Sequence, residues 1–272
     1  MVSRADTIYQ NPMKIPLLRP LHPAAASQAG SVGQDFQRQF YESGYEAPLV
    51  VPTRPRILDA WLPSVSRLDV AVSLLPGGVR LLDVGCGDGQ LLEQAAVKFK
   101  ELFGVDIARN RVERANERLK HLPQPCDLRT VKLDRESLPF ESDFFDAVVA
   151  VAVLPFVFDV DHALHEMTRV LKPGGALLVQ TNNLGFLRHR LSVLFRGEVR
   201  TSYFYGWDGN TLHYFSRTPL VDALGSCGLR VQTISTSGRL QKIRAKWPAV
   251  LGADLIVLAK KAQRPCDSQT EP

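Results

Sequence analysis

The sequence predicts an α/β fold in which a parallel β-sheet carries helices on both faces. From Val79 onward, short apolar runs alternate with amphipathic helical patterns, which is typical of such a sheet. One run, Asp146–Leu154, consists almost entirely of Val and Ala, as expected for a strand buried on both faces. The pattern predicts a doubly wound sheet with seven strands at residues 79–84, 101–105, 128–133, 146–154, 176–181, 229–235 and 253–259.

The residues before the first of these strands divide into two parts. Residues 1–34 hold four prolines and then an Ala-, Ser- and Gly-rich run, which indicates a flexible leader. Residues 35–78 are predicted to form a helical cap, with an amphipathic helix over 57–75 that Pro76-Gly77-Gly78 ends. A separate helical pattern over Asp35–Tyr45 places aromatic side chains on one face. Tyr41 and Tyr45 either help to pin that helix to the core or form a lid over a ligand.

A glycine-rich turn follows the first strand. Gly85, Gly87 and Gly89 alternate, so the backbone can turn sharply and approach a ligand closely. A dinucleotide fingerprint would need glycine at position 90, where Gln90 stands, and no Gly-Lys-Ser/Thr follows, so a P-loop is excluded too. Asp83 precedes the turn by two residues and suits a positively charged ligand better than a pyrophosphate.

A second acid ends the second strand. Asp106 lies seventeen residues after Gly89, the right distance for a carboxylate that accepts both hydroxyls of a ribose. The helices expected around this strand cover 90–98 and 108–119. The second helix has a charged side that is predicted to face solvent and consists of Arg109, Arg111, Glu113, Arg114 and Glu117.

Further motifs lie along the next elements. Asp134 follows the third strand, and Leu138-Pro139-Phe140 comes shortly after it. A helix over 160–171 ends at Lys172-Pro173-Gly174-Gly175, a combination that stops a helix and turns the chain into the next strand.

Together these motifs, from Asp83 through Asp106 and Asp134 to Lys-Pro-Gly-Gly, resemble the class I S-adenosylmethionine-dependent methyltransferases over about residues 79–183. The alternative is a tight strand–helix turn with an incidental acid. The resemblance implies a Rossmann-like methyltransferase fold with an antiparallel last strand, a domain over 79–262, and S-adenosylmethionine as the cofactor. It implies that the cofactor contacts Asp83, Gly85, Cys86, Gly87, Gly89, Asp106, Ile107, Leu133, Asp134 and Val151.

An insertion over 184–214 separates the fifth strand from the rest of the domain. Its Asn-x-Gly, His-Arg-Leu and His-x-Phe-Ser patterns resemble methyltransferases of bacterial cell-surface glycan pathways and methyltransferase-like proteins associated with methionine biosynthesis. Insertions here overhang the carboxyl edge of the sheet, so we expect a substrate lid that includes Arg188 and Tyr205. A helical cap without a chemical role is the alternative.

The position after the fourth strand lacks an obvious base. Many relatives carry Glu-His where this chain has Pro155 and Phe156, and Leu154 departs from the Asn/Asp-Pro-Pro-Tyr/Phe motif of many amino-methylating enzymes. We expect Phe156 to line the acceptor site. His213 is the preferred base among the histidines, ahead of His162, His165 and His189, although a structural histidine that binds a backbone carbonyl is an equal alternative.

Charge and composition bound the function. The net charge of +5 divides into +2 for residues 1–56, −4 for 57–183 and +7 for 184–272. The basic part raises an RNA or protein methyltransferase as an alternative, but no nucleic-acid module is apparent and nucleic acid is not the expected partner. We expect a small-molecule, glycan or lipid-linked acceptor, methylation on oxygen, and a weak membrane-surface contact through 184–200. A non-catalytic S-adenosylmethionine-binding partner protein is the third class.

The remaining features concern location and metals. No apolar signal segment is present at the start, and the longest apolar run, Ala147–Phe158, is too short to span a bilayer, so a cytoplasmic protein is expected. The four cysteines share no C-x-x-C spacing, and no metal site is predicted. Residues 263–272 are expected to be a disordered tail. The sequence indicates no particular oligomeric state.

Overall fold

The computed structural model describes residues 64–133, 136–197 and 212–263. The strands are β1 (Ser64–Val65), β2 (Gly78–Val84), β3 (Phe99–Asp106), β4 (Cys126–Thr130), β5 (Phe145–Val151), β6 (Leu171–Asn182), β7 (Leu229–Ser235), β8 (Gly238–Arg239) and β9 (Asp254–Lys261). The helices are α3 (Arg67–Leu74), α4 (Gln90–Ala95), α5 (Arg109–Leu119), α6 (Val160–Val170), α7 (Leu187–Arg196), α8 (Arg217–Ser226), α9 (Gln241–Arg244) and α10 (Pro248–Leu251), with 3₁₀ turns η2 (Ala96–Lys98) and η3 (Leu154–Phe156).

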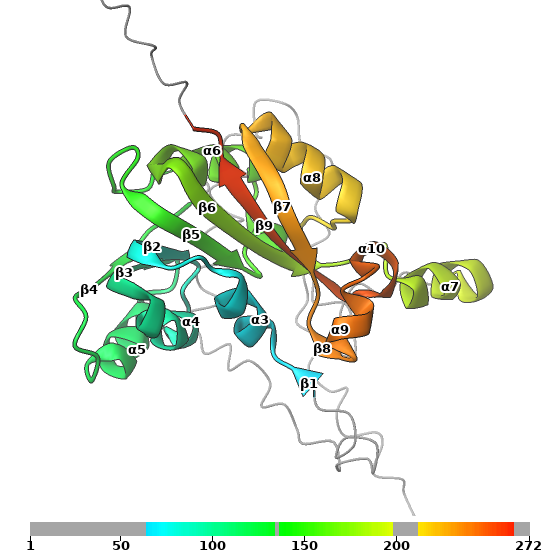
Figure 1. Ribbon diagram of the computed structural model, residues 1–272, viewed down its shortest axis with the longest axis horizontal. Helices are drawn as coiled ribbons and strands as arrows, with labels where there is room; N and C mark the ends of the chain where they lie inside the picture. Colours follow the sequence, from blue (N-terminus) through cyan, green and yellow to red (C-terminus); the bar gives the residue numbers. More distant parts are fainter. Residues whose placement is uncertain (1–63, 134–135, 198–211, 264–272) are drawn as a thin grey trace, which may run out of the picture. The chain divides into compact units, whose positions relative to one another are not determined.

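Seven strands form one sheet in the order β4-β3-β2-β5-β6-β9-β7 (Figure 1). All neighbouring pairs from β4 to β6 are parallel, and β9 runs antiparallel to both β6 and β7. The predicted doubly wound sheet with an antiparallel last strand is therefore confirmed. The chain builds outward from β2 to β4 and then returns to β5 on the other side of β2, which makes the β2–β5 boundary a topological switch point.

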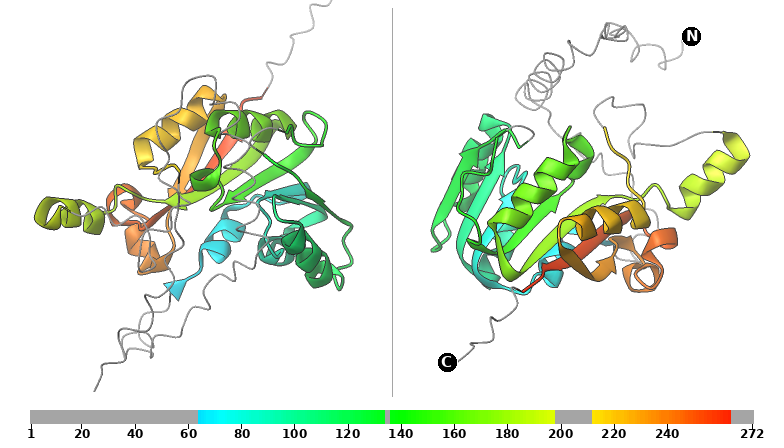
Figure 2. Two further views of the ribbon diagram at one scale, coloured as in Figure 1. Left: turned by 180° about the vertical axis from the view of Figure 1, so that it is seen from behind. Right: turned by 90° about the horizontal axis from the view of Figure 1, so that it is seen from above.

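Two apolar cores cover the two faces of the sheet. Because side chains alternate along a strand, Leu81 packs on one face with α3 and α4, while Leu82 packs on the other with α6 and α8. Figure 2 shows these helices on opposite sides of the sheet. Phe145 and Met167 are fully buried in the core beneath α6. The central strands are thus fixed on both sides, which holds their carboxyl ends in a defined position.

Several predicted boundaries differ from the structure. The helix predicted over 57–75 is wrong at Ser64–Val65, which pairs with β8, and α3 begins only after Ser66, whose hydroxyl accepts a hydrogen bond from the Leu68 amide. Pro63 precedes this strand and disfavours a continuous helix. The third strand covers 126–130 rather than 128–133. The fourth ends at Val151, because Pro155 cannot extend the ladder and begins instead a 3₁₀ turn.

The Lys172–Gly175 segment is a bulge and not a separate turn. Strand β6 already begins at Leu171, which pairs with Phe145, and regular pairing resumes at Ala176. Gly174 has a φ of 77°, which allows the chain to bulge out at this point. Lys172 Nζ lies 2.6 Å from Asp146 Oδ1 and holds the bulge against β5.

Candidate cofactor site

The candidate site lies beyond the carboxyl ends of β2, β3 and β5, at the topological switch point. The predicted residues Gly85, Asp106 and Val151 end or follow these three strands and come together there. Ile107 follows Asp106 and is half-buried. Leu133 is buried in the core under α6. Asp134, Tyr41, Tyr45 and Tyr205 lie outside the described residues.

The glycine turn has left-handed backbone angles at all three glycines, with φ of 74° at Gly85, 53° at Gly87 and 79° at Gly89. The Val105 carbonyl accepts hydrogen bonds from the Gly85 and Cys86 amides, at 2.7 and 3.0 Å. The Gly89 amide donates to the Cys86 carbonyl. Because these amides already have partners inside the protein, the turn is not an anion cradle, in agreement with the exclusion of a P-loop.

The three glycines have different surroundings. A Cβ at Gly85 would overlap Val153 Cγ2, and a Cβ at Gly89 would lie 3.2 Å from Ala115 Cβ of α5. A Cβ at Gly87 would meet only Arg111 Nη1, at 3.7 Å. Gly85 and Gly89 therefore allow close packing of the protein against itself, whereas at Gly87 only the far end of the flexible Arg111 side chain lies nearby, which leaves this side of the turn the most accessible to a ligand.

The Asp106 carboxylate is fixed by two backbone amides. Oδ2 accepts from Gly87 and Oδ1 accepts from Ala108, each at 2.9 Å. A carboxylate oxygen has more than one lone pair, so both oxygens can still accept hydroxyl groups. Burial raises the pKa of Asp106, and the two amides together with Arg111 oppose this shift. The two amides thus hold the carboxylate in one orientation.

Asp83 is a buried carboxylate in the same site. It is 3% exposed, and its carboxylate accepts no hydrogen bond within the described ranges. Burial raises its pKa well above the ordinary value, and repulsion from Asp106 adds to the shift. A positively charged ligand would compensate both effects. The pair Asp83 and Asp106 therefore makes this site acidic and suited to a cation that also carries hydroxyl groups.

Three residues of the site escaped sequence reasoning. Gly104 in β3 leaves room for Cys86, because a Cβ at Gly104 would lie 3.0 Å from Cys86 Sγ. The Cys86 side chain is accordingly buried in the core, and burial raises the pKa of its thiol. Arg111 was predicted on the exposed side of its helix, but it is half-buried and reaches the glycine turn. Val153 fills the space beside Gly85. A glycine inside a strand was the one signal that could have been used.

The segment that carries His213 is held against the loop after β5. The Leu212 and His213 amides donate to the Pro155 carbonyl, at 2.8 and 3.2 Å. His213 Nε2 lies 3.2 Å from the Phe158 carbonyl, which can only accept, so in the neutral ring Nε2 carries the proton and Nδ1 is the acceptor nitrogen. Phe156, expected to line the acceptor site, is half-buried in this loop. His213 therefore lies near the carboxyl end of β5 and also makes the backbone contact foreseen as the alternative.

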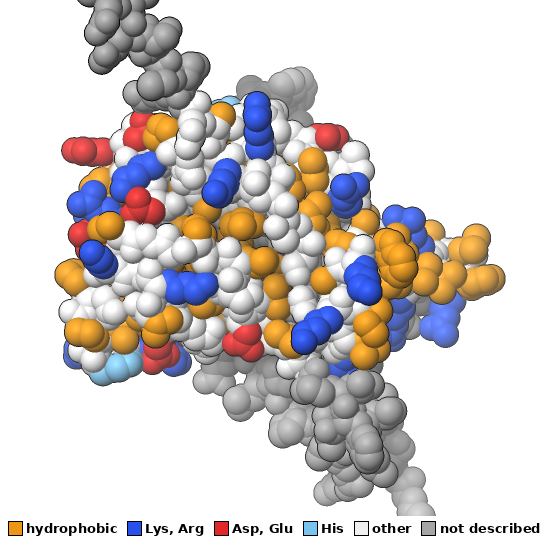
Figure 3. Space-filling view, in the orientation of Figure 1, with side chains coloured by type: hydrophobic (Ala, Val, Ile, Leu, Met, Phe, Trp, Pro, Cys, Tyr) orange, Lys and Arg blue, Asp and Glu red, His pale blue; other side chains and the backbone are white. Residues whose placement is uncertain are grey.

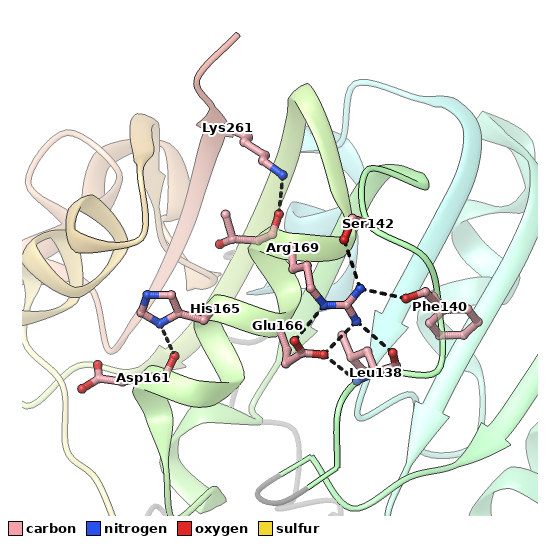
Figure 4. A network of polar contacts seen from close by, with 9 residues as sticks. Leu138, Phe140, Ser142, Asp161, His165, Glu166, Arg169 and Lys261 are labelled. Atoms are coloured by element: carbon pink, nitrogen blue, oxygen red, sulfur yellow. Dashed lines mark hydrogen bonds and ion pairs between the residues drawn. The ribbon is translucent and has the colours of Figure 1, made fainter. Parts of the chain in front are cut away.

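A clamp on α6 holds the loop that follows Asp134. Arg169 donates to the Leu138 and Phe140 carbonyls, each at 2.9 Å, and to both carboxylate oxygens of Glu166 (Figure 4). Glu166 Oε2 in turn accepts the Leu138 amide at 2.7 Å. These hydrogen bonds from Arg169 hold the pKa of Glu166 below its ordinary value. The clamp thus joins the Leu138-Pro139-Phe140 segment to α6, which carries Glu166 and Arg169.

A structural asparagine immediately precedes the insertion. Asn183 Nδ2 donates to the Pro248, Ala249 and Gly252 carbonyls, and its Oδ1 accepts the Gly185 amide. The helix α7 then projects away from the sheet (Figure 2), and Arg188 on it is exposed. The insertion is thus tied at its base to α10. Of the predicted lid, only residues 184–197 and 212–214 belong to the described ranges.

The fold and the acidic glycine-turn site define the class of domain. Residues 82–179 match the family model described as a methyltransferase domain. This part of the chain is therefore similar to class I S-adenosylmethionine-dependent methyltransferase domains, whose cofactor is S-adenosylmethionine. The buried, uncompensated Asp83 and the open side of Gly87 fit this cofactor.

Two curated relatives and one solved structure are similar to this chain. The chain is 31% identical over 163 residues to the human mitochondrial ubiquinone biosynthesis O-methyltransferase, covering 58% of this chain and 43% of the relative. It is 34% identical over 163 residues to a ubiquinone/menaquinone biosynthesis C-methyltransferase of Edwardsiella ictaluri, covering 57% and 61%. It thus spans less than two thirds of either relative. A crystal structure of an S-adenosylmethionine-dependent methyltransferase from Mesorhizobium loti has the same fold, with a TM-score of 0.52, 20% identity, and coverage of 71% of this chain and 96% of that one.

Proposed function

We propose that this protein transfers a methyl group from S-adenosylmethionine to an oxygen of a small-molecule, glycan or lipid-intermediate acceptor. The observation that carries the proposal is the buried Asp83 carboxylate beside the glycine turn, because a cationic ligand would stabilise its ionised form. Asp106 would accept the ribose hydroxyls, since both of its oxygens are already oriented by backbone amides. The open side of Gly87 would let the ligand approach the backbone.

S-adenosylmethionine, when bound, supplies an activated methyl group on a sulfonium. The protein then mainly has to hold the acceptor oxygen in line with that methyl group, which alone can contribute several kcal/mol. An oxygen acceptor also has to lose a proton. We propose His213 as the base, because its Nε2–H contact with the Phe158 carbonyl leaves Nδ1 free of a proton and fixes the ring.

The acceptor class rests on two arguments. The apolar Leu154 and the following Pro155 depart from the motif of many amino-methylating enzymes, which favours oxygen over nitrogen. The relatives named for ubiquinone biosynthesis include an O-methyltransferase and a C-methyltransferase, so a lipid intermediate is a reasonable acceptor to test, and carbon is the alternative acceptor atom.

The first experiment is calorimetry of S-adenosylmethionine and S-adenosylhomocysteine binding. We expect saturable binding to the wild type and to the control Asp222→Ala, which removes an exposed acid of α8. Asp106→Ala should weaken binding at least about tenfold, since it removes a charged acceptor of two hydroxyls. Equal binding by Asp106→Ala, or no binding by folded wild type, would contradict the proposed site.

The acceptor experiment uses a methyl-labelled cofactor with quinols, hydroxylated glycans and lipid intermediates. His213→Asn should lower kcat by about 10²-fold or more while cofactor affinity is unchanged. An unchanged kcat would show that His213 is not the base and that its role is the structural contact with the Phe158 carbonyl. Turnover on RNA or protein alone would favour the macromolecular alternative, and tight cofactor binding without any turnover would favour a non-catalytic partner protein.

A further inference from the structure

Three helices beyond the carboxyl edge of the sheet expose apolar side chains. None of the residues of α7 is buried, and Leu194 and Phe195 are 73% and 77% exposed. In the neighbouring α9–α10 segment, Trp247 is 64% exposed and Ile243 is 53% exposed. Exposure of large apolar side chains to water is unfavourable, and several such side chains close together indicate a contact surface.

The apolar residues of α7 share one face. Leu187, Leu191, Leu194 and Phe195 are spaced by four, three and one residues, which places them on one side of a helix. Arg188 and Arg190 follow Leu187 at positions that flank this side, and both are exposed. The helix therefore has an apolar stripe bordered by arginines.

The α9–α10 segment repeats this combination. Leu240, Ile243 and Trp247 are exposed at helical spacing, and Lys242 and Lys246 are exposed between them.

Contacts join α7 to this segment. The Arg244 guanidinium lies 5.5 Å from the centre of the Phe186 ring, at the start of α7. Asn183, just before α7, donates to the Pro248 and Gly252 carbonyls around α10. Figure 1 shows α10 next to the start of α7. The two sets of exposed side chains therefore belong to one part of the molecule.

The charge of this region is uniform. Residues 186–197 contain three arginines and no acid, and residues 238–253 contain four basic residues and no acid. Within the described ranges, no ion pair neutralises Arg188, Arg190, Arg196, Lys242 or Lys246. Figure 3 shows apolar and basic side chains interspersed over α7 and its neighbours.

We propose that α7 and α9–α10 form a docking surface for an anionic lipid bilayer, which we call the basic apolar surface. Leu, Phe and Trp side chains would enter the boundary between head groups and acyl chains, while Arg and Lys would contact anionic head groups. No helix in the described ranges is long and apolar enough to cross a membrane.

Charge argues against the other occupants. A second copy docked by the same face would bring arginines and lysines against one another with no acid between them, which is unfavourable. An RNA would pair with the basic residues but would leave Leu194, Phe195 and Trp247 without an apolar partner. An anionic bilayer matches both the charge and the apolar side chains.

The position of the surface adds a consequence. It borders the ends of β6 and β7 and the start of β9, at the same edge of the sheet as Asp83 and Asp106. A bilayer docked there would lie on the acceptor side of the domain. The docking itself does not depend on the proposed methyl transfer, and its test needs no turnover.

The test is flotation of the full chain with vesicles. We expect binding to phosphatidylcholine vesicles that contain phosphatidylglycerol, weak binding to pure phosphatidylcholine, and loss of binding as salt is raised. Leu194→Gln/Phe195→Gln should weaken partitioning about tenfold or more, because it removes two inserted apolar side chains. Lys242→Gln/Lys246→Gln should weaken it by about fivefold for each residue, and only on anionic vesicles.

The matched control is Val97→Gln/Lys100→Gln, which removes one exposed apolar and one exposed basic residue at the opposite edge of the sheet. It should bind vesicles as the wild type does, and all variants should keep the wild-type circular dichroism. Absence of binding to anionic vesicles, or equal binding by Leu194→Gln/Phe195→Gln, would overturn the proposal. So would a dimer that this variant abolishes, or RNA binding without vesicle binding.

Discussion

Gly85, Gly87 and Gly89 share a left-handed backbone but differ in what surrounds them. Gly85 contacts Val153 and Gly89 contacts Ala115, whereas the nearest group to Gly87 is the end of the Arg111 side chain. At the scale of single residues, the same amino acid therefore serves packing at two positions and ligand approach at the third. These roles can be separated experimentally, because stability and cofactor affinity should respond differently.

Gly85→Ala should lower the free energy of unfolding by about 2–3 kcal/mol, since it combines a left-handed alanine with overlap against Val153. Gly87→Ala should cost only about 1 kcal/mol and should weaken cofactor binding. Denaturant unfolding measures both. Adding Val153→Ala should recover part of the loss at Gly85 and none at Gly87. Equal costs at the two glycines would refute the distinction.

Asp83 should reduce the stability of the cofactor-free protein. Its pKa is raised in the folded state, so stability is fully present below the unfolded pKa of about 3.9 and is lost as pH rises through the folded pKa. Asp83→Asn should raise the free energy of unfolding by about 0.5–2 kcal/mol at neutral pH, with a difference that grows with pH. The same variant should bind S-adenosylmethionine more weakly. Thermal unfolding across pH and calorimetry measure the two effects.

A variant that is less stable at every pH would contradict the buried-charge argument. Part of the pH dependence should remain in Asp83→Asn, because burial also raises the pKa of Asp106. Asp222→Asn, on the exposed surface of α8, is the matched control and should change neither stability nor affinity.

At the scale of elements, α6 acts through the clamp it forms on the 138–142 loop. Arg169 contacts two carbonyls and one carboxylate, so truncation leaves both carbonyls without this donor and leaves Glu166 with only the Leu138 amide. Arg169→Met should therefore lower the free energy of unfolding by about 2–4 kcal/mol. Arg109→Met, which breaks an exposed ion pair with Glu113, should change it by less than about 0.5 kcal/mol. Similar values for both variants would disprove the clamp.

The elements also divide by how far the sequence could predict them. Strands β2, β3 and β5 were predicted because a local apolar run and a following turn define each of them. The β1–β8 pair was missed, since Ser64–Val65 pairs with Gly238–Arg239 far along the chain. The bulge at Gly174 looked like a turn, because its role depends on pairing with β5. Local signals thus predicted the sheet, and pairing across the chain decided the rest.

The site shows the same division. Asp83, Gly87 and Asp106 were predicted from their spacing together with the family resemblance, and the structure brings them together. Arg111 was assigned to solvent, because helical periodicity cannot show that the glycine turn lies over that face of α5. The cofactor contact expected at Cys86 stays a prediction. The inward direction of its side chain was not foreseen, because it depends on the room that Gly104 leaves in the neighbouring strand.

At the scale of the whole molecule, one edge of the sheet carries both the cofactor site and the basic apolar surface. The first is built from the ends of β2, β3 and β5, and the second from elements beyond β6, β7 and β9. Acidic residues therefore lie at the ends of β2 and β3, and basic residues lie beyond β6, β7 and β9 along the same edge. Two functions so arranged should be energetically separable.

Cofactor binding should stabilise the whole domain without involving the basic apolar surface. A ligand at 100 times its Kd adds about 2.7 kcal/mol to the free energy of unfolding, or about 5–10 °C in Tm for a domain of this size. S-adenosylhomocysteine should raise the Tm of the wild type and of Leu194→Gln/Phe195→Gln by the same amount, because those side chains are exposed on α7. Asp106→Ala should show little shift at the same concentration. A reduced shift in the Leu194→Gln/Phe195→Gln variant would mean that α7 contributes to the cofactor site, and the two surfaces would have to be treated as one.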